Sequence, residues 1–348
     1  MKCNNIFYTV AATASMLAFT PLNAAPTIFS GTGSAATTEF NNFKAAIKSA
    51  TNVDGSAINW DAVKLDGTDA SPKTRIIQAG KTVEIPVDRF KNRGVIFADP
   101  YLVSSDGFAT ANPATAQQFP AFSVNNTFAM FDSKNKEFKD FKIEQNFVLL
   151  NTDTKAGTRG FGAIFLDVEQ VGSSTIEYFG RDAADKQISL GKYYVKAGSN
   201  SGEAQFLGVL FDSPVVTDVE ITPGVRALFS FDGKNIASFG AEDLNKGIDL
   251  AVTDDFFFAV PETAKISTVK TSDADCLLNW AERNYSGFFY PAGSSTLTYP
   301  PYNYRYYKNT NSYLGVSYSD NHVYYLDGSG KLLDAGDLNT WLNTSKCK

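Results

Sequence analysis

The sequence is poor in the residues that build most catalytic centres. Its 348 residues include one histidine, His322, with three cysteines and three methionines. A single histidine excludes metal sites that need two imidazoles, including the common zinc and copper geometries. A serine nucleophile would depend on His322 alone, and no Gly-x-Ser-x-Gly sequence, P-loop or dinucleotide fingerprint is present. We therefore expect a non-enzymatic protein with no catalytic residues and no catalytic cofactor, in which His322 packs beside tyrosines.

Basic residues and long hydrophobic runs are also scarce. The chain has 31 Lys and Arg against 37 Asp and Glu, a formal net charge of −6. Nucleic acid is excluded as a partner, because phosphate binding needs clustered Lys and Arg. Beyond Thr20, no apolar stretch approaches the length of a membrane-spanning helix, so no transmembrane anchor is expected.

The segment from Met1 to Ala24 is typical of a signal peptide. Lys2 precedes an uncharged apolar run from Ile6 to Phe19, Pro21 interrupts it, and Ala24 offers a small residue for cleavage. Cleavage after Ala24 removes Lys2 and lowers the net charge from −6 to −7. The sequence thus predicts export, to the periplasm or the extracellular space.

Two cysteines, Cys276 and Cys347, remain after this cleavage. Paired cysteines are the usual state in an oxidising compartment, so we predict a disulfide between them. The loop that it would close has about 72 residues, for which the chain-entropy model gives roughly 4 kcal/mol of stabilisation.

Residues 25–262 are predicted to form a β-sandwich domain with antiparallel sheets, jelly-roll-like, after a short N-terminal helix. The helix is predicted from Thr38 as its cap and from Phe40, Phe43 and Ile47 on one face. Short β-branched or aromatic runs bounded by Gly, Asp, Asn or Pro follow, and their spacing indicates strands of a sandwich. They are 81–87, 94–98, 162–168, 174–179, 205–211, 215–221 and 254–260.

A polar linker, 263–272, separates this domain from a small tyrosine-rich α+β domain, 273–348. The pattern predicts a helix, a β-meander and a second helix capped by Asp337, all closed by the disulfide. The meander strands are predicted at 302–306, 313–318 and 322–326. The fold class is therefore mainly β.

Several stretches resemble domains of exported bacterial proteins. DCLLNWAERNY, YRYYKNTNSYLGVSYSDNHVYYL and LNTWL resemble a C-terminal domain of exported proteobacterial proteins that has no assigned activity. INWDAVKLDGTD, FGAIFLDVE and TDDFFFAVPE resemble a β-sandwich module of exported bacterial proteins, some of which carry C-terminal sorting tails. This chain lacks such a tail. The resemblances imply export and fold rather than a function.

Calcium, as a structural ion, is the metal candidate, because carboxylate oxygens suit it and exported proteins encounter it. Acidic residues gather in WDAVKLDGTD, FLDVE and TDDFFF, and by analogy a calcium ion would join an early loop to the last strand. The candidate ligands are Asp61, Asp167, Asp254 and Asp255. The alternative is that these aspartates cap turns or are solvated.

Nine of the sixteen tyrosines lie between Tyr299 and Leu326. Tyrosine packs through its ring while its hydroxyl forms hydrogen bonds, so the cluster indicates either a binding face or cross-strand packing. The candidate ligand-binding residues are Tyr302, Tyr304, Tyr306, Tyr307, Tyr313 and Tyr325. We predict binding of a polysaccharide or envelope glycan. One alternative is a structural or adhesive matrix protein that contacts a surface protein, and another is a glycoside hydrolase or lyase built on two carboxylates.

Overall fold

The computed structural model describes two parts of the chain. These are residues 26–69, 76–78, 80–130, 142–182, 185–232 and 235–265, followed by 276–278, 280–281, 295–299, 302–307, 312–317, 322–327, 329, 331–337 and 340–341. The predicted signal peptide and most of the predicted linker lie outside the described residues. Among the described helices, none is both long enough and apolar enough to cross a membrane.

The larger part is an antiparallel β-sandwich, as predicted. Its first sheet has nine strands in the order β1-β12-β9-β16-β7-β6-β4-β3, with β2 paired beside β16. They are β1 (Thr27–Thr32), β2 (Ser56–Ile58), β3 (Ile76–Gln78), β4 (Thr82–Ile85), β6 (Tyr101–Ser104), β7 (Thr127–Met130), β9 (Gly160–Leu166), β12 (Ala204–Leu210) and β16 (Val252–Phe258).

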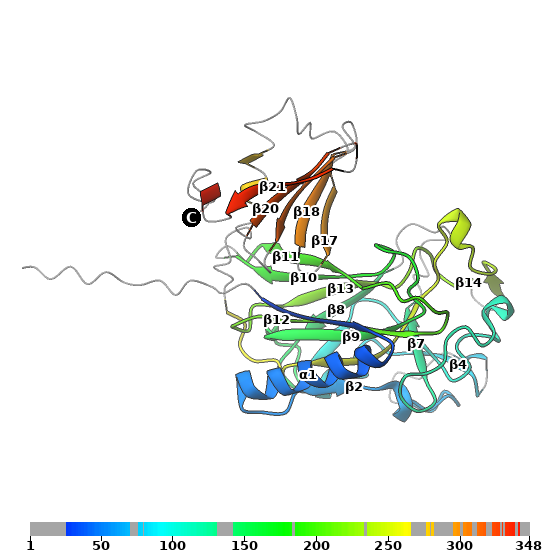
Figure 1. Ribbon diagram of the computed structural model, residues 1–348. Coiled ribbons are helices and arrows are strands. Elements are labelled where there is room, and N and C mark those ends of the chain that lie inside the picture. Colours follow the sequence, from blue (N-terminus) through cyan, green and yellow to red (C-terminus); the bar gives the residue numbers. More distant parts are fainter. Residues whose placement is uncertain are drawn as a thin grey trace, which may run out of the picture.

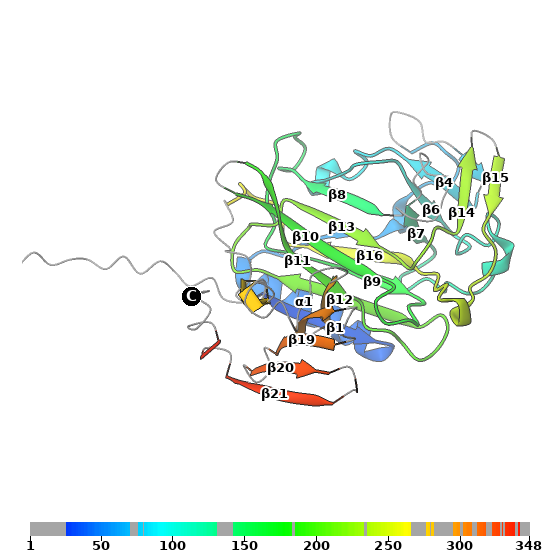
Figure 2. The ribbon, with the colours of Figure 1, turned by 90° about the horizontal axis from the view of Figure 1, so that it is seen from above.

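The second sheet has five strands in the order β11-β10-β13-β8-β5. They are β5 (Val95–Phe97), β8 (Ile143–Phe147), β10 (Thr175–Arg181), β11 (Gln187–Tyr194) and β13 (Asp218–Thr222). A hairpin of β14 (Phe229–Asp232) and β15 (Asn235–Ser238) stands apart. Figures 1 and 2 show the layers: the five-stranded sheet, then the nine-stranded sheet, then helix α1 (Ser34–Thr51).

Strand β9 is buried along its whole length, because the nine-stranded sheet is covered on both faces. Phe161, Ala163 and Phe165 point into the core between the two sheets. The alternate residues Ile164 and Leu166 pack in a second core under α1. A strand buried on both sides must be apolar at every position, which explains the unbroken run GFGAIFL.

Trp60 fills the centre of the first core. Its ring stacks on Phe128 with centroids 4.1 Å apart, and its indole N–H donates to the Asp254 carbonyl at 2.8 Å. The side-chain amide of Asn126 donates to the Trp60 carbonyl at 2.7 Å. Buried polar groups of this kind need partners, and here they tie three distant segments together.

The predicted strands of the sandwich are all observed, with ends shifted by a few residues. The helix face is also as predicted, because Phe40, Phe43 and Ile47 are buried. The predicted cap is wrong: α1 begins at Ser34, and Thr38 lies inside it and donates its hydroxyl to the Ser34 carbonyl. The helix begins earlier because Gly33 adopts a φ of +57° and turns the chain out of β1.

The C-terminal sheet has five antiparallel strands where the sequence predicted three. They are β17 (Ser295–Tyr299), β18 (Tyr302–Tyr307), β19 (Ser312–Ser317), β20 (His322–Leu326) and β21 (Leu332–Asp337), paired in chain order. Asp337, predicted to cap a helix, is the last residue of β21; Thr340 and Trp341 are helical. Strand β17 lies beside β11, the edge of the five-stranded sheet (Figure 1).

The core of this C-terminal sheet is small. Leu314, Val316 and Val323 pack against the helical residues Leu277, Leu278 and Ala281. Cys276, next to them, is disulfide-bonded. Its predicted partner, Cys347, lies outside the described residues, so that pairing stays a prediction.

A substitution at Phe43 tests whether the packing of α1 on the nine-stranded sheet stabilises the fold. It is fully buried and packs edge-on against Phe29, with centroids 5.4 Å apart, and against Phe206. We expect Phe43→Ala to lower the free energy of unfolding by about 3–5 kcal/mol. The exposed neighbour Asn42→Ala is the control, and chemical denaturation is the measurement. Equal stability of the two variants would contradict this packing.

Candidate functional site

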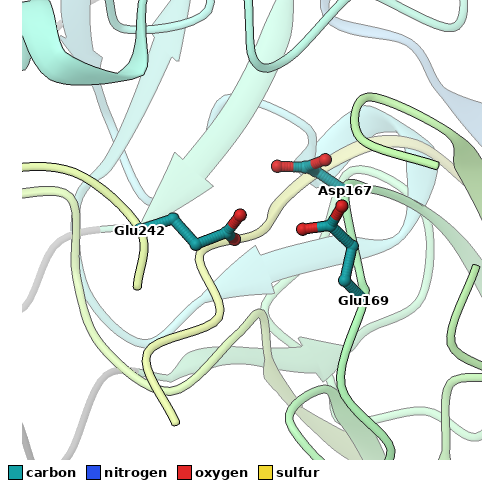
Figure 3. Close-up of side chains that lie close together, drawn as sticks. All are labelled: Asp167, Glu169 and Glu242. Atoms are coloured by element: carbon teal, nitrogen blue, oxygen red, sulfur yellow. The ribbon is translucent and has the colours of Figure 1, made fainter. Parts of the chain in front are cut away.

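Three carboxylates from two loops meet at one end of the sandwich. Asp167 and Glu169 follow β9, and Glu242 lies between β15 and β16. One oxygen from each lies within 4.8 Å of the others, and Figure 3 shows the three side chains converging.

Asp167 is held rigidly at the base of this cluster. It is fully buried, and its backbone has a φ of +71°. The Gln118 amide donates to its Oδ2 at 2.5 Å, and the Gly202 N–H donates to Oδ1. Burial raises the pKa of Asp167, although these hydrogen bonds oppose the shift.

Glu242 has the most perturbed carboxyl of the three. Burial raises its pKa to about 8, and the nearby charges of Asp167 and Glu169 add to the effect. The Leu250 N–H donates to Glu242 at 3.0 Å. Ionised carboxylates this close repel one another in a partly buried site, so protonation of one of them, or a bound cation, lowers the electrostatic free energy.

The neighbouring loop is fixed by another buried acid, Asp249. Its carboxylate accepts hydrogen bonds from the N–H groups of Glu169 and Gln170, at 3.2 and 2.8 Å. The loop that carries Glu169 is therefore tied to the chain that leads from Glu242 into β16.

A second acidic group lies in a bulge of β16. Two residues, Asp254 and Asp255, stand opposite the single residue Ile164 of β9. The bulge turns both carboxylates toward Ser123, whereas successive strand residues normally point to opposite faces. The Ser123 hydroxyl lies 2.9 Å from Asp255 Oδ1 and 3.5 Å from Asp254 Oδ1.

Asp254 acts as a clamp on the loop before β7. Its Oδ2 accepts hydrogen bonds from the N–H groups of Phe122 and Ser123, at 2.7 and 3.3 Å. Burial raises its pKa to about 8, and the charges of Asp255 and Asp61 contribute. Burial also raises the pKa of Asp255.

The four predicted metal ligands therefore fall into two groups. Asp61 approaches Asp254 and Asp255, and Asp167 joins Glu169. Glu242, the third carboxylate of this cluster, was not among the predicted residues, because it lies far from Asp167 along the sequence, in a loop with no distinctive pattern. The other acids of WDAVKLDGTD have local roles: Asp66 accepts from Thr68, and Asp69 pairs with Arg89 at 2.9 Å.

The backbone register sorts the tyrosines of the C-terminal sheet. Gly315 pairs with position 304 on one side and with Tyr324 on the other, and Tyr313 pairs with position 306. These positions alternate with the buried Leu314 and Val316, so they belong to the face opposite the small core. The side chains of Tyr302, Tyr304, Tyr306 and Tyr307 lie outside the described part of the structure.

The two adjacent tyrosines of β20 occupy opposite faces. Tyr325 packs against the small core, whereas Tyr324, which was not among the predicted site residues, lies on the other face beside His322. The ring centroids of His322 and Tyr324 are 6.2 Å apart. The Nδ1 atom of His322 lies 2.9 Å from both carboxylate oxygens of Asp334 on β21.

Comparison with known proteins gives little. No family model matches the chain, and no curated protein is significantly similar to it. One similar solved structure is a non-crystalline cellulose specific carbohydrate-binding module, CBM28, at 9% identity and a TM-score of 0.21. The match covers 40% of this chain and 75% of that one. A TM-score of 0.21 is too low to indicate a shared function.

The buried Asp254 predicts a pH dependence of stability. Its folded pKa of about 8 lies above the ordinary value of 3.8, so the folded state holds a proton that the unfolded chain releases. Stability should fall as the pH rises from about 4 to 8, by on the order of a few kcal/mol, and this loss should then level off.

Asp254→Asn keeps the hydrogen-bond acceptor for Phe122 and Ser123 but removes the titration. Denaturant unfolding at several pH values should show a shallower fall for this variant than for the wild type. Parallel pH profiles of the two proteins would contradict the assignment.

Proposed function

We propose that this chain is an exported, non-enzymatic protein that binds carbohydrate in the cell envelope or outside the cell. The observation that carries the proposal is the register of the C-terminal sheet. It gathers positions 302, 304, 306, 313 and 324, all tyrosines, on the face opposite the core.

Such a face suits a sugar polymer. Tyrosine rings pack against the apolar C–H side of a pyranose, and their hydroxyls and neighbouring polar groups form hydrogen bonds with its hydroxyls. The nine-stranded sheet offers no comparable surface among its described residues: α1 packs its own Phe40 and Phe43 against Phe206 on one face, and the five-stranded sheet covers the other. A binding role for aromatic residues therefore fits the C-terminal sheet best.

Export is supported by two independent features. The segment from Met1 to Ala24 has the charge, apolar run and small residue of a cleavable signal. In addition, Cys276 is disulfide-bonded, and structural disulfides persist in oxidising compartments rather than in the cytosol.

Tyr324 and Tyr325 provide a matched test of the binding face. We expect Tyr324→Ala to keep the melting temperature and to lose retention on a panel of cellulose, chitin and peptidoglycan. Tyr325→Ala should instead lower the stability of the C-terminal domain, by up to about 3–5 kcal/mol, because its ring packs on the core. Pull-down and thermal melting of the mature chain are the measurements.

Retention of Tyr324→Ala at the wild-type level would contradict the tyrosine face. Binding to none of the polysaccharides by the wild type would overturn the carbohydrate proposal itself and favour an adhesive or structural role.

We further propose that Asp167, Glu169 and Glu242 bind a structural calcium ion. Three carboxylates with oxygens within 4.8 Å supply the hard ligands that calcium prefers. The ion would replace the proton that Glu242 otherwise holds and would join the loops after β9 and before β16. Asp61, Asp254 and Asp255 are less suited, since Asp254 already clamps two N–H groups.

Calcium should raise the melting temperature of the mature chain, and more at pH 8.5 than at pH 5, because the raised pKa of Glu242 means that protons compete at low pH. Glu242→Gln should abolish the effect. The control is Asp66→Asn, which alters an exposed acid that only caps its own turn. If millimolar calcium leaves the melting temperature unchanged at both pH values, the calcium site is ruled out.

A further inference from the structure

The rim of the C-terminal sheet carries a β-bulge that holds a histidine in place. On β21, Gly336 pairs with Val323 and Asp334 pairs with Tyr324, so Ala335 is an extra residue. Gly336 has a φ of +102°, and a Cβ there would meet nothing within 4 Å. The glycine is therefore required by the backbone conformation rather than by crowding, as in bulges that re-aim a side chain.

The bulge is pinned from both sides of the sheet. On the core side, the Trp341 indole N–H donates to the Ala335 carbonyl at 2.8 Å. On the other side, the Gly336 N–H donates to Asp334 Oδ1, also at 2.8 Å. These contacts hold the Asp334 carboxylate in position, and its Oδ1 atom lies 2.9 Å from His322 Nδ1.

The Asp334 contact sets the chemistry of the imidazole. A carboxylate at Nδ1 accepts its proton, so in the neutral ring Nε2 is the hydrogen-bond acceptor. The centroids of the His322 and Tyr324 rings lie 6.2 Å apart with an angle of 31° between their planes, so the two rings are neighbours on one face of the sheet. The His322 side chain is 37% exposed and that of Asp334 is 50% exposed.

We propose that Tyr324 and His322 form a subsite for a neutral pyranose unit, with Asp334 as the residue that positions the imidazole. This inference rests on the proposed carbohydrate binding and names its contact point. The sugar ring packs on Tyr324, and one of its hydroxyls donates to His322 Nε2. A neutral sugar fits better than a uronic acid, because the Asp334 carboxylate and the negative net charge, −6 for the full sequence and −7 without Lys2, repel anions.

His322 is the chain's single histidine, so nitrogen NMR of the untagged mature protein reports on this site alone. The wild type should show the proton on Nδ1. Soluble oligosaccharides from the polysaccharide that retains the protein should shift the Nε2 signal. His322→Ala should weaken binding at least about ten-fold with an unchanged melting temperature, and His322→Gln, which keeps an acceptor, should restore part of it.

Asp334→Asn should redistribute the imidazole tautomers and weaken binding. Its matched control is Asp327→Asn, which removes a carboxylate from the β20–β21 turn, where it accepts from Ser329 and Lys331. The control should bind like the wild type.

The outcomes separate the two proposals. If the wild type binds sugar but the His322 signals stay fixed at saturation, the subsite is wrong and the carbohydrate function stands. If Asp327→Asn weakens binding as much as Asp334→Asn, binding depends only on the structure of the β20–β21 hairpin. The proposal that Asp334 positions the His322 imidazole is then overturned. If the wild type binds no polysaccharide, both proposals fall.

Discussion

The need to cover both faces of the nine-stranded sheet governs the rest of this molecule. Strands β9 and β16 are buried on both sides, so one face requires the five-stranded sheet and the other requires α1 with the loop before β7. That loop has little structure of its own, and the bulge in β16 fixes it by turning Asp254 toward the N–H groups of Phe122 and Ser123. A buried carboxyl thus takes the place of a backbone partner, and in consequence it holds a proton near neutral pH.

This arrangement separates the tasks of the two parts of the chain. The sandwich uses its aromatic residues internally, as in the cluster around Trp60, and keeps its unusual polar groups at loops. Among its described residues, the C-terminal sheet packs a small core against one face, and its register places tyrosine positions on the opposite face. In the proposed function, stability and recognition therefore depend on different sheets.

Local patterns in the sequence were enough for the strands of the sandwich and for the buried face of α1, because those depend on short-range periodicity. They were not enough for the start of α1, where Gly33 overrode Thr38, nor for β21, whose bulge interrupts the alternation of a strand. Glu242 meets Asp167 only through the tertiary fold. Tyr324 and Tyr325 are chemically alike, and only the register of β19 and β20 tells which one is in the core.

The proximity of β17 to β11 bears on whether the protein self-associates. An uncovered edge strand presents free N–H and C=O groups that can recruit strands from other molecules. Residues of β17 lie against β11 without backbone pairing between the two strands, so the second part of the chain covers part of this border strand. Proteolysis between the two parts would then do more than remove the tyrosine-rich sheet: it would also uncover this border strand and make the sandwich more prone to self-association.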